Sequence, residues 1–196
     1  FHCKTLDEDQ KCAINGALEH EISIITGSPG VGKSTICAEI VRRLELLEIP
    51  FCIGSYTGKA VSRIQDILGH KRAMTLDRMI AQASSIPPFK HLIIDEVSMV
   101  TTELLYRVLT TFKFKFRLTL IGDKDQLSPI SWGNLFTELL ASGRIPTYRL
   151  THNHRLVPHT MTQTLTVKED QAPGELEFDR IVLENANALV APHRNL

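Results

Sequence analysis

The fold of this chain is decided by the stretch Ile22-Ser23-Ile24-Ile25-Thr26-Gly27-Ser28-Pro29-Gly30-Val31-Gly32-Lys33-Ser34. Residues 22–26 form an apolar run that predicts a buried strand. Residues 27–34 fit the spacing G-x-x-x-x-G-K-[ST] of a phosphate-binding loop. From Thr35 to Leu47 apolar residues recur at helical spacing, so a helix is expected directly after the loop. The succession of strand, glycine-rich loop and helix predicts that the chain binds a nucleoside triphosphate.

Each residue type in the loop suits this chemistry. The glycines let the backbone N–H groups turn inward around a phosphate, and the helix N-terminus adds the positive end of its dipole. Lys33 is expected to reach the β- and γ-phosphates, and the hydroxyl of Ser34 to ligate Mg²⁺. A glycine-rich turn with a surface lysine is the alternative, and the complete motif in this context argues against it. The predicted nucleotide contacts are Gly27, Ser28, Pro29, Gly30, Val31, Gly32, Lys33, Ser34 and Thr35.

Apolar runs alternate with amphipathic segments as far as about Leu156. Strands are predicted at 51–54, 91–95, 117–122 and 147–150, and helices at 60–68, 101–109 and 135–141. This alternation predicts an α/β fold with a mainly parallel sheet flanked by helices on both faces. In such sheets a ligand binds at the carboxyl ends of the strands.

Two adjacent acids end the apolar run 91–95. In P-loop enzymes an aspartate at this place holds Mg²⁺, so Asp95 is the predicted metal ligand together with Ser34. A neighbouring carboxylate can activate the attacking water, which makes Glu96 the predicted general base. A solvated strand end is the alternative, and the phosphate-binding loop upstream argues against it.

Two later residues are predicted to act at the γ-phosphate. Gln126 lies in Gly122-Asp123-Lys124-Asp125-Gln126-Leu127-Ser128-Pro129, directly after the predicted strand 117–122. It is expected to sense whether the γ-phosphate is present. Arg155 follows the strand 147–150, and a guanidinium there would neutralise charge that develops in the transition state. Taken alone, Arg155 is more often a surface cation.

In this order, the motifs resemble superfamily 1 helicases. The series is Gly27 to Ser34, Tyr56-Thr57-Gly58-Lys59-Ala60, Thr75-Leu76-Asp77-Arg78-Met79, Ile94-Asp95-Glu96-Val97-Ser98-Met99, Gly122 to Pro129 and Leu150 to Arg155. It is similar to helicase motifs I, Ia, Ib, II, III and IV. Gly133-Asn134-Leu135 and residues 141–146 resemble the RecD branch more than the UvrD branch. The resemblance covers about Thr5 to Leu156.

The resemblance implies a RecA-like motor domain that uses ATP and moves 5′ to 3′ along single-stranded DNA. Gln10 matches the glutamine that recognises the adenine edge. Thr57, Gly58 and Lys59 match the part of motif Ia that contacts the phosphates of the strand, and Thr75 matches motif Ib. Attraction between Lys59 and a phosphate would make strand binding salt-dependent, whereas an ordinary lysine at a helix start is the alternative.

The sequence departs from the family pattern in three ways. Tyr56 stands where proline is usual, and Asp77 where motif Ib usually has histidine. Motifs V and VI, which belong to the second motor domain, are absent. The expected organisation is a RecA-like ATPase domain at 1–156, followed at 157–196 by a linker and the incomplete start of a second motor domain. The chain is expected to be either a fragment of a longer protein or a natural chain with half a motor.

The composition agrees with an intracellular protein. Of 196 residues, 43% are hydrophobic and 22% charged, and the net charge is zero. This balance argues against a surface that coats nucleic acid everywhere, but it allows a single basic groove. We find neither a membrane-spanning stretch nor a signal-peptide pattern, and the four cysteines form no CxxC pair.

Three functions are compatible with a phosphate-binding loop. The first is an ATP-dependent helicase motor on single-stranded nucleic acid, with DNA favoured over RNA. The second is a nucleotide-gated module that binds a single strand without unwinding. The third is a P-loop phosphotransferase, against which the segment around Gln126 and the presence of Arg155 argue. The intact Lys33 and Glu96 favour the motor.

Overall fold

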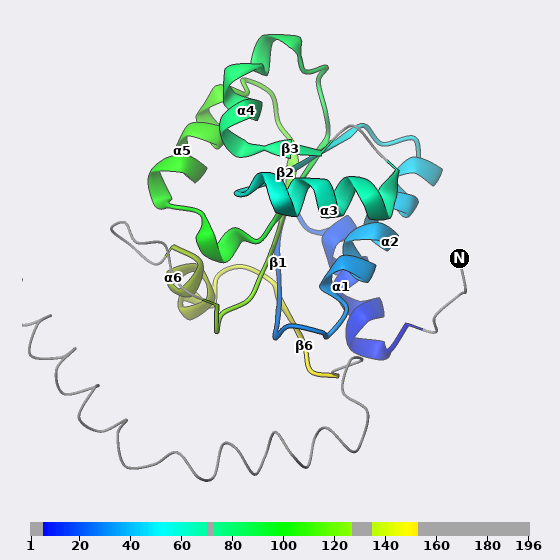
Figure 1. The fold of residues 1–196 in the computed structure, drawn as a ribbon. Coiled ribbons are helices and arrows are strands. Elements are labelled where there is room, and N and C mark those ends of the chain that lie inside the picture. Colours follow the sequence, from blue (N-terminus) through cyan, green and yellow to red (C-terminus); the bar gives the residue numbers. More distant parts are fainter. Residues whose placement is uncertain (1–5, 70–72, 127–134, 153–196) are drawn as a thin grey trace, which may run out of the picture. The chain divides into compact units, whose positions relative to one another are not determined.

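The computed structural model describes residues 6–69, 73–126 and 135–152, and its core is a six-stranded sheet (Figure 1). Its strands are β1 Ile22–Gly27, β2 Phe51–Ser55, β3 Ala73–Thr75, β4 His91–Asp95, β5 Arg117–Gly122 and β6 Thr147–Leu150. They follow the order β3-β2-β4-β5-β1-β6, and every pairing is parallel. The carboxyl ends of all six strands therefore lie along one edge of the sheet.

Strand β1 lies inside the sheet, where Ile25 pairs with Ile121 of β5 on one side and Tyr148 of β6 on the other. Successive side chains point to opposite faces of a strand. Accordingly Ile24 belongs to one buried cluster and Ile25 to the other. Because both faces are covered, the strands are continuous apolar runs, which is the pattern that made them predictable.

The helices form one layer on each face of the sheet (Figure 1). Helices α1 Glu8–Glu19, α2 Lys33–Leu46 and α3 Gly58–Leu68 supply residues such as Ile14, Ile40 and Ile64 to the first cluster. On the other face α4 Leu76–Ala81, α5 Thr102–Thr111 and α6 Leu135–Ser142 supply Met79, Leu104 and Phe136. The short 3-10 helices η1 Ala83–Ser85 and η2 Val97–Met99 complete the described elements. The architecture is thus a three-layer α/β fold.

Helix α1 begins at a capping box and packs closely on the sheet. The Asp7 carboxylate accepts a hydrogen bond from the Gln10 N–H at 2.8 Å, and the Gln10 side chain accepts one from the Asp7 N–H at 3.2 Å. Farther along, a Cβ atom at Gly16 would lie 2.0 Å from Cζ and Oη of Tyr148. Glycine at this position therefore lets the helix approach β6.

The structure confirms the predicted α/β class and the bounds of β4, β5 and β6, and it corrects several details. The sheet is parallel throughout, whereas a mainly parallel sheet was predicted. Helix α2 begins at Lys33 and not at Thr35, because Gly32 takes the left-handed conformation that ends the loop there. Helix α3 begins at Gly58 and not at Ala60, because the Thr57 hydroxyl caps it.

Some elements were not predicted, and some predicted segments lie outside the described residues. Helices α1 and α4 and strand β3 were not predicted. The expected linker and second-domain start at 157–196 lie outside the described residues. None of the described helices is long and apolar enough to cross a membrane.

Candidate nucleotide-binding site

The loop between β1 and α2 has the backbone geometry of a phosphate cradle. Gly30 and Gly32 have φ values of 94° and 92°, which glycine adopts without the steric cost of a Cβ atom. Helix α2 starts directly after Gly32, and no side chain caps its N-terminus. The N–H groups of its first turn thus have no side-chain acceptor at the cap, which is the arrangement that binds anions.

A cavity of about 580 Å³ lies at the carboxyl ends of β1, β4 and β5. The strand order places these three ends side by side, although they are far apart in the sequence. The predicted site residues that line the cavity are Gln10, Pro29, Gly30, Gly32, Lys33, Ser34, Thr35, Asp95, Glu96 and Gln126. Most of the predicted nucleotide contacts therefore surround one space.

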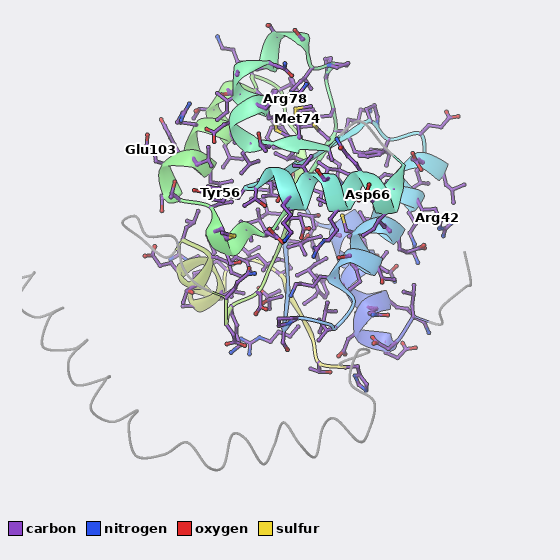
Figure 2. The ribbon with its side chains drawn as sticks, viewed as in Figure 1. Arg42, Tyr56, Asp66, Met74, Arg78 and Glu103 are labelled. Carbon is purple, nitrogen blue, oxygen red and sulfur yellow. The ribbon has the colours of Figure 1, made fainter. Side chains whose placement is uncertain are left out.

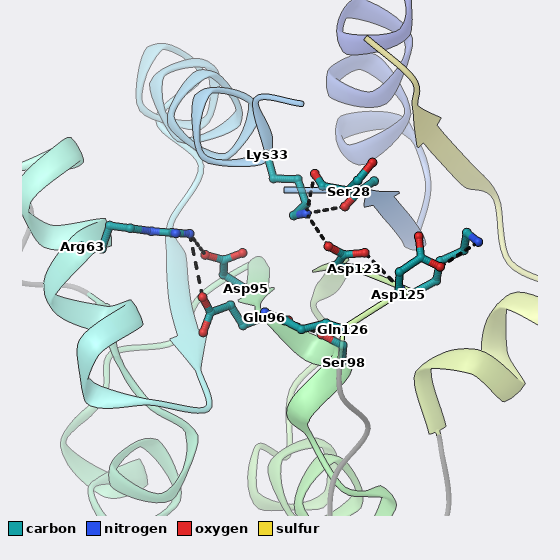
Figure 3. Close-up of polar contacts among 11 residues, drawn as sticks. Ser28, Lys33, Arg63, Asp95, Glu96, Ser98, Asp123, Asp125 and Gln126 are labelled. Carbon is teal, nitrogen blue, oxygen red and sulfur yellow. Dashed lines mark hydrogen bonds and ion pairs between the residues drawn. The ribbon is translucent and has the colours of Figure 1, made fainter. Parts of the chain in front are cut away.

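Lys33 is held between the loop and a carboxylate that follows β5 (Figure 3). Its Nζ donates hydrogen bonds to the carbonyl oxygens of Gly27 and Ser28, the latter at 3.1 Å. The same atom lies 3.6 Å from Oδ2 of Asp123, whose side chain is 4% exposed. Burial lowers the pKa of Lys33, and Asp123 opposes this effect by stabilising the ammonium form. Asp123 thereby keeps a cation at the mouth of the loop.

Asp95 is buried at the end of β4 and has a half-exposed arginine for a partner. Nη2 of Arg63, from α3, lies 3.5 Å from Oδ2 of Asp95 and 4.0 Å from Oε1 of Glu96 (Figure 3). The backbone carbonyl of Asp95 accepts a hydrogen bond from the Ser55 hydroxyl at 3.1 Å. Burial raises the pKa of Asp95, and the guanidinium of Arg63 opposes that rise.

Glu96 follows in a backbone conformation that is rare outside glycine. Its φ of 56° lies in the left-handed region, where it caps the 3-10 helix η2. Such conformations cost about 1–3 kcal/mol and cluster at functional sites. The turn brings the Glu96 carboxylate to the cavity beside that of Asp95, with 23% of the side chain exposed.

The amide of Gln126 is positioned by a residue of the neighbouring motif. Its Oε1 accepts a hydrogen bond from the hydroxyl of Ser98 at 2.9 Å, and Ser98 is buried in η2. The turn before Gln126 is closed by Asp123, whose Oδ1 accepts a hydrogen bond from the Asp125 N–H at 3.0 Å. Gln126 is thus tied to the same short helix that follows Glu96.

Ser34 and Asp95 line the same cavity and together offer a hydroxyl and a carboxylate. Mg²⁺ prefers such hard oxygen ligands and keeps several waters beside one or two carboxylates. The Asp95 side chain, at 5% exposed, is a buried carboxylate that a cation would stabilise. The donor set therefore fits the predicted magnesium ion.

Gln10 lies at the edge of the cavity and is buried, with 4% of its surface exposed. Its Nε2 donates a hydrogen bond to the carbonyl oxygen of Val31 at 3.3 Å, which ties α1 to the loop. Gln10 is therefore a buried residue at the cavity and not a solvated residue on the surface of α1.

The residues expected to contact single-stranded DNA are not among those that line the cavity. Thr57 caps α3 by accepting a hydrogen bond from the Ala60 N–H at 3.2 Å, and Thr75 caps α4 by accepting one from the Arg78 N–H at 3.3 Å. Lys59 is exposed in the first turn of α3. Tyr56, which is 40% exposed, precedes that helix (Figure 2). Both threonines thus stabilise helix starts, and this structural role does not depend on bound DNA.

A family model described as an AAA domain matches residues 5–182. The chain belongs to the AAA domain family. This AAA domain is 31% identical over 160 residues to the ATP-dependent RecD2 DNA helicase of Deinococcus radiodurans, a match that covers 78% of this chain and 22% of that protein. The predicted resemblance to superfamily 1 helicases of the RecD branch is confirmed as a distant homology over the first RecA-like domain.

Solved structures support the same fold. The AAA domain superposes on the Pif1 helicase from Candida albicans with a TM-score of 0.65 at 19% identity, covering 90% of this chain and 47% of that one. For Bacteroides Pif1 bound to ssDNA the TM-score is 0.56 at 18% identity, and the match covers 83% of this chain and 46% of that one. The chain thus spans about half of these structures and a smaller part of the RecD2 protein.

Two residues that face the cavity of the AAA domain were given no role by the sequence. They are Arg63, which pairs with both acidic residues, and Asp123, which pairs with Lys33. Asp123 belongs to the motif that contains Gln126, so the sequence could have indicated it. The sequence indicates Arg63 only weakly, through its place one helical turn after Lys59. The predicted Arg155 lies outside the described residues.

Proposed function

We propose that this domain binds ATP with Mg²⁺ and hydrolyses it as the first motor domain of a helicase that moves 5′ to 3′ along single-stranded DNA. One observation carries the proposal: Lys33, Asp95, Glu96 and Gln126, from three neighbouring strand ends, line one cavity beneath the phosphate-binding loop. This arrangement supplies a cradle for phosphates, a metal ligand, a base and a sensor in one place.

The loop and its lysine would bind the phosphates. Backbone N–H groups at the start of α2 would surround the β-phosphate, and Lys33 would turn from the carbonyls of Gly27 and Ser28 to the phosphate oxygens. Ser34 and Asp95 would hold Mg²⁺, which neutralises charge on the phosphates when bound. Gln10 would recognise the adenine edge from the far side of the loop.

Glu96 would act as the general base. Its carboxylate lies at the same cavity as that of Asp95, after a turn in which the Glu96 backbone is left-handed. There it would take a proton from the attacking water. Gln126, held by Ser98, would contact the γ-phosphate, and Arg155 would neutralise the charge that develops during transfer.

Single-stranded DNA would run past the starts of α3 and α4, with contacts from Thr57, Gly58, Lys59 and Thr75. The relatives support this substrate, since one is named a DNA helicase and the Bacteroides Pif1 structure is bound to ssDNA. The polarity rests on the RecD resemblance.

The chemical part is tested by Glu96→Gln, which keeps the size of the side chain and removes the base. We expect ATP affinity within a few fold of wild type and a loss of turnover of about 10²–10⁴-fold. Equilibrium binding of a fluorescent ATP analogue and steady-state phosphate release measure the two quantities. Asp125→Asn, an exposed acid in the same region of the chain, is the matched control. Normal turnover in Glu96→Gln would refute the assignment of the base.

The motor part is tested by strand displacement on duplexes with a single-stranded tail at either the 5′ or the 3′ end. We expect ATP-dependent displacement only from the 5′-tailed duplex. Displacement from the 3′-tailed duplex would reverse the polarity. ATP and strand binding without displacement would favour the nucleotide-gated module.

A further inference from the structure

Helix α3 joins the two regions that a motor must connect. Its N-terminus carries Thr57, Gly58 and Lys59, the expected strand contacts, and its second turn carries Arg63. Residues four apart lie on the same face of a helix, so Lys59 and Arg63 are neighbours along one side of α3. One helix thus carries Lys59 at the expected DNA contact and Arg63 at the nucleotide cavity, which Arg63 lines.

The contact of Arg63 differs from an ordinary surface ion pair. The side chain is 47% exposed, whereas that of its partner Asp95 is only 5% exposed. A single nitrogen, Nη2, faces both carboxylates, at 3.5 Å from Asp95 and 4.0 Å from Glu96 (Figure 3). Lys33, the other cation of the cavity, contacts Asp123 instead. Among the described ion pairs, Arg63 of α3 is therefore the cation that pairs with both Asp95 and Glu96.

A second contact links the same region to Asp95. The Ser55 hydroxyl, at the end of β2, donates a hydrogen bond to the Asp95 carbonyl at 3.1 Å. Ser55 lies just before Tyr56 and the Thr57 cap, so the backbone at the start of α3 is fixed relative to β4. With that end anchored, Arg63 is the residue of α3 that the described ion pairs connect to both acids, and its side chain is half-exposed.

We propose that Arg63 is a positioning residue that couples strand binding at the start of α3 to the carboxylates of Asp95 and Glu96. The inference rests on the proposed function and adds the path by which one site influences the other. A strand phosphate at Lys59 changes the charge one helical turn from Arg63 and thereby the position of its guanidinium. Because coupling between two binding sites is reciprocal, bound nucleotide must change strand affinity by the same factor.

The test is the coupling factor itself, measured on the full chain. A fluorescein-labelled oligothymidylate is titrated by anisotropy with and without Mg²⁺ and a non-hydrolysable ATP analogue, and the ratio of the two Kd values is the coupling factor. Typical factors are about 5–150-fold. Arg63→Gln is expected to bring the factor close to one. Arg63→Lys keeps a cation there and is expected to retain most of the coupling.

Arg42→Gln is the matched control, because Arg42 makes an exposed ion pair with Glu39 on α2, and it is expected to leave the factor unchanged. Strand affinity of Arg63→Gln without nucleotide is expected to stay near the wild-type value. The analogue is used at a concentration that saturates each variant, checked by its own titration, so that weak nucleotide binding alone does not lower the ratio. A merely structural role would then weaken strand binding with and without nucleotide without changing the ratio of the two Kd values, and that result would overturn the inference. A coupling factor equal to wild type in Arg63→Gln would also overturn it. Failure of the wild-type protein to bind the strand would instead refute the proposed function.

Discussion

Replacing His91 with glutamine should make the stability of the protein less sensitive to mild acid. His91 begins β4 and is 1% exposed. Its Nε2 lies 2.9 Å from the Thr119 hydroxyl, which in turn lies 3.2 Å from the Ser23 hydroxyl. The three residues thus form a polar chain across β4, β5 and β1 inside the sheet.

Burial lowers the pKa of His91 from 6.5 to about 4, and the charge of Arg117 adds to this effect. Between these two values the unfolded chain binds a proton that the folded protein excludes. The contribution of His91 to the free energy of unfolding is therefore fully present above pH 6.5 and is lost as the pH falls toward 4. At 1.36 kcal/mol per pKa unit the whole interval corresponds to about 3 kcal/mol.

The assay is urea unfolding of wild type and His91→Gln at about pH 7.5 and about pH 5, where linkage predicts that wild type loses about 2 kcal/mol more than the variant. Glutamine can still hydrogen-bond to Thr119 but does not titrate, so the carboxylates common to both proteins cancel in the comparison. Equal losses in the two proteins would show that His91 is protonated in the folded state at pH 5, which would refute the reasoning.

Four further substitutions, two of them a pair, test individual positions. Gly16→Ala should lower the free energy of unfolding by about 1–3 kcal/mol despite the better helix propensity of alanine, and Tyr148→Leu should restore it, because the added Cβ meets the ring. Asp123→Asn should lower the free energy of unfolding by about 1–3 kcal/mol in urea titrations, because Lys33 loses its buried partner. Lys59→Ala should weaken oligonucleotide binding and reduce its salt slope by about 1 if it contacts a phosphate. If the salt dependence of binding is unchanged in Lys59→Ala, Lys59 does not contact a phosphate of the DNA.

The sequence predicted those parts of the fold in which local pattern and burial agree. Strand β4 is an apolar run between His91 and Asp95, and β5 runs from Arg117 to the glycine that precedes Asp123, so the bounds of both strands were predicted to the residue. Strand β3 has three residues and α4 has six, which is too short for periodicity to be recognised. Helix α1 was missed because it buries mainly small residues, such as Ala13 and Ala17.

The residues that line the cavity were predicted where they belong to a sequence motif, and were missed where only the order of the strands brings them together. The loop and the acids at 95 and 96 are fixed by spacing along the chain. Arg63 reaches those acids because β2, which precedes α3, pairs with β4. A sequence alone does not contain that strand order, so an arginine on a helix surface resembles an ordinary solvated cation.

The measurement that tests the central claim most directly is steady-state ATP turnover of the full chain with and without single-stranded DNA, with Lys33→Ala as the inactive reference. We predict that wild type hydrolyses ATP, that the strand raises its turnover, and that Lys33→Ala shows neither effect. Nucleotide binding with a turnover that the strand does not change would contradict the account of a motor domain.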